Sequence, residues 1–325
     1  MDARGGGKKR QAPEPPLPSL SNLKDCQPFA PKKRNTGTVK AQDKRRVGHP
    51  LNFTWENPEG KLWELPFMKR FVANEFVKRS NGGGVLTEIV FQRKTSYCQY
   101  DSPFEKPTRF VTSLPDLELA KPCVERRCAI SKGPQRKHPA ELQGQSSATK
   151  NAIPTGIIFS IFEAWTATYS GSKPKPVFVL FDAFAGFGST QKAADAWNKT
   201  RGADEQIKVV QNDILRSRGD VTINMQSFSL RTAIGLILGP YLGASDSSSR
   251  PAATSLVSLL RENRIALLIH LSTPCETYSR ASGCVHRARG SADPLTPKAE
   301  AHDVMNERLV SELQELLLEG ADEEG

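Results

Sequence analysis

The hydrophobic pattern is most regular in the second half of the chain. Apolar runs occupy Val177–Phe184 and Ile265–Ser272, a further strand is expected at Ile207–Ile214, and segments with helical spacing lie between them. Such runs are typical of parallel strands buried on both faces, and strands that alternate with helices predict a parallel sheet. We therefore expect an α/β fold with helices on both faces of the sheet and Val177–Phe184 as a central strand. The helices are expected from about Thr190, at Thr232–Leu242, in the segment ending at Arg261 and at about Pro297–Leu318, with a Ser-rich loop at 244–253.

The first half has shorter and more varied elements. Apolar positions at helical spacing predict helices at Lys61–Phe76 and Ile153–Tyr169, the second with a proline in its first turn, where the missing donor is harmless. Residues 115–149 have no clear period and are expected to form a small irregular lobe. We also expect short strands at Asn52–Trp55, Val85–Phe91 and Arg109–Leu114.

Positive charge is concentrated at the start of the chain. Residues 1–48 hold 12 Lys/Arg and 4 Asp/Glu, so this segment carries +8 of the formal net charge of +10. It has no periodic apolar pattern, and a segment that cannot bury apolar surface is expected to be disordered. Its basic runs suit a nuclear import signal, a clamp on nucleic-acid phosphates or a solubilising tail. We expect a folded domain at 49–320 and an acidic tail at 321–325.

The composition excludes some classes of protein. Six cysteines in 325 residues, without a signal peptide, do not suggest a disulfide framework, so a secreted protein is not expected. No apolar run reaches the roughly 18 residues that a membrane-spanning helix needs. We expect an intracellular protein without a membrane partner, in the nucleus if the cell is eukaryotic and otherwise in the cytoplasm.

A glycine loop follows the expected central strand. The sequence DAFAGFG at 182–188 joins a strand to a helix, and Gly186 and Gly188 let the backbone turn tightly and approach a ligand. Ligands of open parallel sheets bind beyond the carboxyl ends of the strands, and Asp213 stands near the end of the next strand. NAD, FAD and nucleotide proteins use related loops, and Asp213 taken alone can equally be a solvated strand-end residue.

A Pro-Cys pair follows the last expected strand. Cys275 comes directly after Pro274, at the end of the strand and in a loop, which is where a nucleophile is expected. The alternative is a buried, inert thiol. Cys284 lies nearby without a preceding proline, and we interpret it as structural.

Five segments of the chain share one order with a known family. They are FTWENPEG at 53–60, YCQYDSPFEKPTRF at 97–110, KNAIP at 150–154, DAFAGFGST at 182–190 and STPCETYS at 272–279. Together they resemble motifs VI, VIII, X, I and IV of the DNA cytosine-5 methyltransferase family, whose usual order is I, IV, VI, VIII, X. One circular rotation, with the break between IV and VI, gives the order found here.

The resemblance implies a Rossmann-like class I sheet that binds S-adenosyl-L-methionine (AdoMet), with the cofactor-binding and catalytic half at 177–318. In the family the glycine loop holds AdoMet, an acidic residue after the next strand binds the ribose, and motif X completes the pocket beside motif I. The cofactor-binding residues implied here are Asp182, Phe184, Ala185, Gly186, Gly188, Asp213 and Asn151.

The resemblance also implies catalytic roles. Cytosine carbon 5 is a poor nucleophile until a thiolate adds to carbon 6, and this role falls to Cys275. Glu56, in Glu-Asn-Pro, is implied as the acid near ring nitrogen 3, with a structural glutamate at a helix entry as the alternative. Thr273 stands where the family usually has another proline.

The motif VIII segment lacks the family's common Gln-x-Arg-x-Arg pattern. The candidates to contact the base or its phosphates are therefore Arg93, Lys106 and Arg109. We choose Arg109 because it opens an expected strand, with a plain surface charge as the alternative.

The interval that the family uses for target recognition is short here, at 115–149. It contains Cys123, Cys128 and His138, with Cys98 as a fourth candidate. Three or four such ligands suit zinc, which would stabilise so small a lobe, and free thiols are the alternative. Basic side chains in the lobe suit contacts with phosphates.

These features predict AdoMet-dependent methylation of cytosine at carbon 5 in double-stranded DNA, with the target base flipped out of the duplex. Two alternatives stay open. The same chemistry can act on RNA cytosine, or the chain can bind AdoMet and nucleic acid without turnover, because of the changes at Thr273, Glu276 and motif VIII. An adenine amino-methyltransferase is not expected, since that class needs an Asn/Asp-Pro-Pro-aromatic loop.

Overall fold

A computed structural model describes most of the chain after its basic N-terminal segment. The described residues are 50–75, 89–124, 128, 130–131, 137–142, 145–172, 174–213, 219–241, 255–278, 285–288 and 290–319. The expected N-terminal arm at 1–48, the Ser-rich loop at 244–253, the acidic tail at 321–325 and Cys284 lie outside the described residues.

A six-stranded mixed sheet organises the described part of the chain. Its strands run in the order β2-β3-β1-β6-β4-β5. β1, β6, β4 and β5 are parallel to one another, whereas β3 pairs antiparallel with both β1 and β2 at one edge. The bounds are β1 (Leu51–Pro58), β2 (Phe91–Ser96), β3 (Pro107–Thr112), β4 (Val177–Asp182), β5 (Ile207–Gln211) and β6 (Ile265–Leu271).

The expected α/β class is confirmed, and so is the central place of the run that begins at Val177. β4 lies between β6 and β5, and its side chains beyond Val177 are buried. Of the strand expected at Val85–Phe91, residues 85–88 lie outside the described residues, Ile89 and Val90 precede β2, and Phe91 is its first residue. Asn74 explains this, since its side-chain oxygen accepts the backbone N–H groups of Ile89 and Val90.

Helices cover both faces of the sheet. The expected helix at Lys61–Phe76 is two pieces, because Pro66 starts the α-helix as its first residue, after a short 3-10 turn. None of the helices within the described ranges is long and apolar enough to cross a bilayer. The α-helices are α1 (Pro66–Val72), α3 (Ser147–Asn151), α4 (Thr155–Ala167), α5 (Ser189–Asn198), α6 (Leu230–Leu238), α7 (Leu256–Glu262) and α8 (Pro297–Glu319), and the 3-10 helices are η2 (Lys61–Glu64), η3 (Tyr97–Tyr100), η5 (Ala203–Glu205) and η6 (Gly239–Tyr241).

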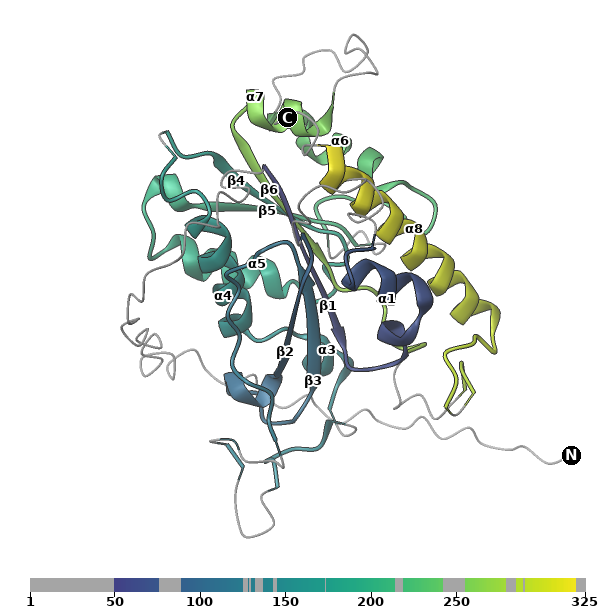
Figure 1. Ribbon diagram of the computed structural model, residues 1–325. Helices are drawn as coiled ribbons and strands as arrows, with labels where there is room; N and C mark the ends of the chain where they lie inside the picture. The colour runs from purple at the N-terminus through teal and green to yellow at the C-terminus, as the bar shows by residue number, and fades with distance from the viewer. Residues whose placement is uncertain are drawn as a thin grey trace, which may run out of the picture. The chain divides into compact units, whose positions relative to one another are not determined.

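The alternation of side chains along the strands builds two cores. In β4, Val179 and Phe181 point to the core that α1, α6, α7 and α8 complete, while Phe178 and Leu180 point to the core that α4 and α5 complete. Figure 1 shows these two groups of helices on opposite sides of the sheet. Burial on both faces explains why β4 and β6 read as continuous apolar runs.

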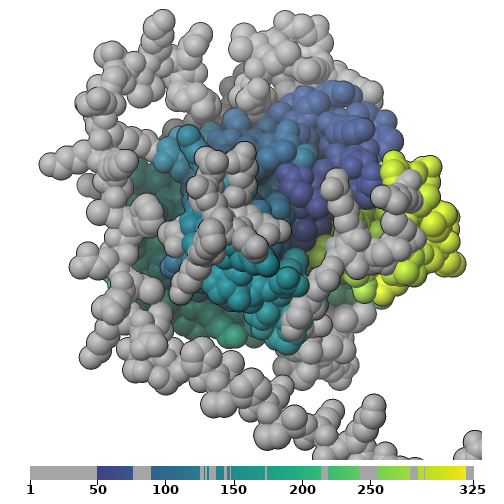
Figure 2. Space-filling view, turned by 90° about the horizontal axis from the view of Figure 1, so that it is seen from below, coloured from purple at the N-terminus to yellow at the C-terminus, as the bar shows by residue number. Residues whose placement is uncertain are grey.

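The start and the end of the described chain are neighbours. α1 packs against α8, and in Figure 2 the purple atoms of the first described segment adjoin the yellow atoms of the last. β1 likewise pairs with β6, so that Trp55 lies opposite Leu271. The motif segments at 53–60 and 272–279, which are farthest apart in the sequence, therefore lie together at the carboxyl ends of the parallel strands.

A crevice lies beyond the carboxyl ends of the parallel strands. β4 is followed by α5 on one face of the sheet, whereas the chain beyond β6 leads to α8 on the other face. The segments that leave these adjacent parallel strands therefore diverge, and ligands of open α/β sheets bind at such a point.

Candidate active site

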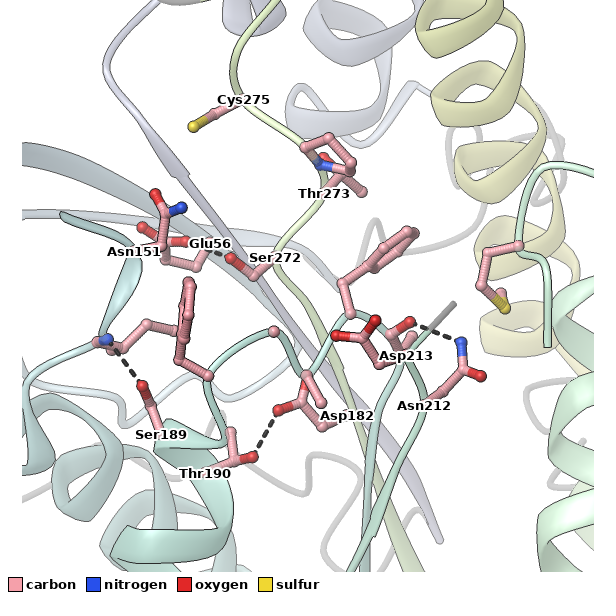
Figure 3. Close-up of a pocket in the computed structure, with 18 of the residues that line it drawn as sticks. Glu56, Asn151, Asp182, Ser189, Thr190, Asn212, Asp213, Ser272, Thr273 and Cys275 are labelled. Atoms are coloured by element: carbon pink, nitrogen blue, oxygen red, sulfur yellow. Dashed lines mark hydrogen bonds between the residues drawn. The ribbon is translucent and has the colours of Figure 1, made fainter. Parts of the chain in front are cut away.

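A pocket of about 460 Å³ occupies the crevice beyond the carboxyl ends of the parallel strands. In Figure 3, Cys275, Glu56 and Asn151 lie toward one end, and Asp182, Asn212 and Asp213 lie toward the other. Its volume falls in the range of about 300–1,000 Å³ that is typical of small-molecule sites.

The glycine loop forms the floor between the two ends. Gly186 and Gly188 have φ values of 52° and 67°, in the left-handed region that favours glycine. The loop leads into α5. The N-cap residue of this helix is Gly188, which has no side chain to accept hydrogen bonds from the first backbone N–H groups. The start of α5 therefore offers donors and a positive dipole end to an anion.

The segment with Asn151 lies beside this loop. The backbone N–H of Ile153 donates to the Ser189 hydroxyl in the first turn of α5, at 3.1 Å. Asn151 and Ile153 both line the pocket. The expected proximity of KNAIP to the glycine loop is thus present in the structure.

Asp182 is the last residue of β4 and lines the pocket. It is buried, and burial raises the pKa of its carboxyl, although His270 and the Thr190 hydroxyl act in the opposite direction. Thr190 donates to Oδ2 at 2.5 Å. Oδ1 has no hydrogen-bond partner in the described part of the chain, so it can accept a donor from a ligand.

The far wall follows β5. The Asn212 amide donates to the carbonyl oxygens of Ala183 and Ile223, both at 3.0 Å, and joins the glycine loop to the segment after β5. Asp213 lines the pocket directly after this asparagine. Of the cofactor-binding residues expected from the sequence, all line the pocket except Gly188, which caps α5.

Cys275 lies on the loop after β6, at the other end. Burial raises the pKa of its thiol, the positive charge of Lys106 opposes this effect, and the Glu56 carboxylate adds to it. The Tyr278 N–H donates to the Cys275 carbonyl oxygen at 3.0 Å and closes a turn. The nucleophile expected from the sequence therefore faces both an acid and a cation.

Glu56 is held by two hydroxyl groups. Tyr97 donates to Oε1 at 2.9 Å and Ser272 donates to Oε2 at 2.7 Å, while Lys106 Nζ lies 3.9 Å from Oε1. The pKa of Tyr97 is raised well above its ordinary value by burial and by the Glu56 charge, so its hydroxyl keeps the proton that it donates. These contacts fix the orientation of a carboxyl that is only 2% exposed.

The structure gives Thr273 a role that the sequence did not suggest. Its buried hydroxyl accepts from Trp55 Nε1 at 3.3 Å and from Asn57 Nδ2 at 3.2 Å. The departure from the family's second proline thus supplies an acceptor that two side chains of β1 use.

Arg109 is not in the pocket. It faces away from it on β3, where its guanidinium pairs with Glu59 at 2.8 Å and lies over the Trp63 ring. Arg93 donates to the carbonyl oxygens of Pro115 and Leu117 instead. The choice of Arg109 is therefore not supported by its position, and the candidate that lines the pocket is Lys106.

Several lining residues were missed from the sequence. The segment after β5 contributes Ile223, Asn224, Met225 and Gln226, and α8 contributes Met305. Tyr97 opens the segment at 97–110, and Ser272 is three residues before Cys275. Their positions in the motifs could have marked both residues, but the sequence assigned neither of them a role.

A second group of reactive side chains lies apart from the pocket lining. Cys98, Cys123, Cys128 and His138 bring their ligand atoms within 4.8 Å of one another. The sequence-based set of three ligands and the fourth candidate therefore meet in one cluster, which can hold a metal ion.

No model of a protein family matches this chain, and no curated protein matches it.

Proposed function

We propose that this chain is an AdoMet-dependent methyltransferase that modifies carbon 5 of cytosine in DNA. The observation that carries the proposal is the convergence of Cys275, Glu56 and the glycine loop on one pocket, although they come from distant parts of the chain. This convergence supports the circular rotation inferred from the motif order, because the rotated order still brings the segments together in space. The pattern of strands and helices is compatible with a class I methyltransferase sheet.

AdoMet fits the donors and acceptors of the pocket. The open N-terminus of α5 suits its carboxylate, and the unpaired Oδ1 of Asp182 suits its ammonium group. Asp213 lies after β5, where a carboxylate would accept from ribose hydroxyls. When bound, AdoMet supplies an electrophilic methyl group.

The protein residues activate the base. A thiolate at Cys275 adds to carbon 6, and the electron pair of the carbon 5–carbon 6 double bond makes carbon 5 nucleophilic. Because burial raises the pKa of this thiol, its proton must pass to solvent before attack, and the Lys106 charge favours that loss. After carbon 5 gains the methyl group, its proton passes to solvent, the electron pair of that C–H bond restores the double bond, and the sulfur leaves as a thiolate.

Glu56, in its protonated form, is placed to donate to ring nitrogen 3 and so to offset the negative charge that addition creates on the ring. With Tyr97 and Ser272 fixing its two oxygens, the carboxyl presents one orientation to ring nitrogen 3. A group that is already oriented costs little reorganisation when charge develops.

The form of the nucleic-acid substrate follows from how the Cys275 thiol can reach the base. Carbon 6 of a stacked cytosine is out of reach of a loop thiol, so the target must be flipped from the duplex or be single-stranded. The basic N-terminal segment suits phosphate binding, and in a eukaryotic cell it suits nuclear import.

The test measures transfer of a labelled methyl group from AdoMet to duplex DNA and, in parallel, to RNA of mixed sequence. We expect 5-methylcytosine in DNA with wild type and none with Cys275→Ser. Binding of AdoMet by the variant is the control, because it must remain if only the nucleophile is lost.

A trap with 5-fluorocytosine DNA gives a second readout. Fluorine at carbon 5 prevents proton loss, so the sulfur adduct should persist as a covalent complex that needs both AdoMet and Cys275. Transfer to RNA alone would change the substrate class, and AdoMet binding without transfer or adduct would support a binding protein without turnover.

A further inference from the structure

The cluster of three thiols and one imidazole lies where the lobe of residues 115–149 meets the turn after β2. Cys98 is in η3, directly after β2, whereas Cys123, Cys128 and His138 come from the lobe that follows β3. Cys98 and Cys123 are buried, and all three cysteines are free thiols. Three soft ligands and one imidazole are a common donor set for structural zinc.

The spacing of the donor atoms fits a tetrahedral ion. Zinc–sulfur bonds of about 2.3 Å place two sulfurs of a tetrahedral site about 3.8 Å apart. The four donor atoms here all lie within 4.8 Å of one another, so a small contraction around an ion completes the geometry. Cys128 Sγ and Cys123 Sγ lie 3.2 and 3.8 Å from the same atom, His138 Nε2.

The contact of the second ring nitrogen of His138 shows how the imidazole is oriented. Nδ1 lies 3.8 Å from a Glu105 carboxylate oxygen, on the opposite side of the ring from the sulfurs. In zinc sites a ligating histidine usually donates its second N–H to a carboxylate or carbonyl oxygen, which fixes the ring. At 3.8 Å the Glu105 carboxylate is outside hydrogen-bond range, but it lies on the side of the ring where such an outer partner is found.

The backbone around the cluster is tied to the sheet. The Cys123 N–H donates to the Ser96 hydroxyl at 3.0 Å, and the Ala140 N–H donates to the Pro103 carbonyl oxygen at 2.9 Å. These bonds bring both ends of the ligand segment against the turn that contains Cys98. Among the described residues of the lobe, Leu117 belongs to the core that α4 and α5 complete, and Leu119 and Leu142 pack against that core, so a metal would supply a cross-link within the lobe itself.

We propose that Cys98, Cys123, Cys128 and His138 bind one structural zinc ion, which fastens the lobe to the end of β2. Four protein ligands leave no position for a substrate, so the ion stabilises the fold and does not act in catalysis. Cys98 directly follows Tyr97, and the ion therefore anchors the turn that presents the Tyr97 hydroxyl to Glu56. The zinc site itself does not depend on the proposed methyl transfer.

The first test uses the full-length wild-type chain, purified under reducing conditions from zinc-supplemented cells. We expect close to one zinc per chain by elemental analysis. Exchange for Co²⁺ should give the thiolate charge-transfer band and the visible bands of a tetrahedral S₃N site. A chain without zinc that gives no thiolate band with Co²⁺ would overturn the proposal, as would a native disulfide among the three cysteines.

Variants assign the ligands. Cys123→Ser and His138→Gln should lose stoichiometric zinc, whereas Cys275→Ser, which changes a cysteine outside the cluster, should retain it. Equal zinc content and an unchanged Co²⁺ spectrum in all three would refute the assignment. Because a ligand variant can fail to fold, the Co²⁺ spectrum of wild type remains the deciding measurement.

The outer partner gives a finer test. Glu105→Gln should fold and should weaken zinc binding by about 10–100-fold, measured by competition with a chromophoric chelator. Asp116→Asn is the matched control, because Asp116 is an exposed acid of the same lobe and is not in the cluster. An unchanged zinc affinity in Glu105→Gln would contradict the orientation proposed for His138.

Discussion

The side-chain amide of Asn57 donates two hydrogen bonds to Thr273, one to the carbonyl oxygen at 3.0 Å and one to the hydroxyl at 3.2 Å. This pair joins the end of β1 to the loop that carries Cys275. Glu56 precedes Asn57, and Cys275 follows Thr273 by two residues, so the same contact sets the distance between the proposed acid and the proposed nucleophile. The adjacent parallel strands β1 and β6 make this contact possible.

Thr273→Val should destabilise the fold. Valine has a similar shape but removes the hydroxyl that accepts from Trp55 Nε1 and Asn57 Nδ2. Leaving buried donors without an acceptor costs about 1–3 kcal/mol. Denaturant unfolding measures the change. Thr166→Val is the control, because the Thr166 hydroxyl donates to the Phe162 carbonyl oxygen within its own helix. An equal loss of unfolding free energy in the control would show that the Thr273 contact has no special effect on stability.

Tyr97→Phe should slow methyl transfer by about tenfold or more without changing AdoMet affinity. The ring remains, but the 2.9 Å hydrogen bond to Glu56 is lost. Leaving a buried polar group without its partner costs about 1–3 kcal/mol, and about 1.4 kcal/mol is a tenfold change in rate. The measurement is the single-turnover rate on cytosine-containing DNA.

Tyr100→Phe is the matched control for that rate. Tyr100 is in the same 3-10 turn, but its hydroxyl accepts from the Ala120 N–H and does not contact Glu56. We expect its rate to stay near that of wild type. Equal rates in both variants would show that the Tyr97 hydroxyl has no part in orienting Glu56.

Lys106→Met should shift the reactivity of Cys275 to higher pH. The lysine charge lowers the pKa of this thiol against the larger effect of burial, so removing the charge raises that pKa further. The rate of alkylation by iodoacetamide, measured against pH and corrected with Cys275→Ser, reports the thiolate. Arg109→Met should leave the profile unchanged, because Arg109 pairs with Glu59 outside the pocket. A shift of equal size in both variants would argue against a specific effect of Lys106.

The sequence predicted the bounds of those strands whose side chains are buried on both faces. β4 and β6 are buried on both faces, so their apolar runs have nearly the same bounds in the pattern and in the structure. The strand expected at Val85–Phe91 can be compared only from Ile89 onward, and there the Asn74 side chain binds the backbone N–H groups of Ile89 and Val90, a contact that no periodicity shows.

The choice among Arg93, Lys106 and Arg109 depended on register. β3 pairs with β1 so that Arg109 lies opposite Asn57, and its side chain meets Glu59 instead of the pocket. Lys106 lies just before the strand, where its Nζ reaches the Lys150 carbonyl oxygen and the Tyr97 hydroxyl. Antiparallel register at a sheet edge is set by contacts between distant segments, so the motif alone could not select the lysine.

Stability should fall in mild acid because of His302. This buried side chain lies on α8, and its Nδ1 is 3.0 Å from the Thr277 hydroxyl in the loop that follows Cys275. Burial lowers the pKa of its imidazole below the ordinary 6.5, so the unfolded chain takes up a proton in a pH range where the folded chain does not. The stabilisation is therefore complete above pH 6.5 and is lost as the pH falls toward the pKa in the folded state.

His302→Gln keeps a polar side chain at this position but does not titrate. Its free energy of unfolding should therefore change less than that of wild type between pH 7.5 and about pH 5, the range in which an ordinary histidine gains its proton. Chemical denaturation at each pH measures both proteins. If the two stabilities kept a constant difference across this range, protonation of His302 would not control the packing of α8 against the Cys275 loop, and the acid sensitivity would belong to other groups.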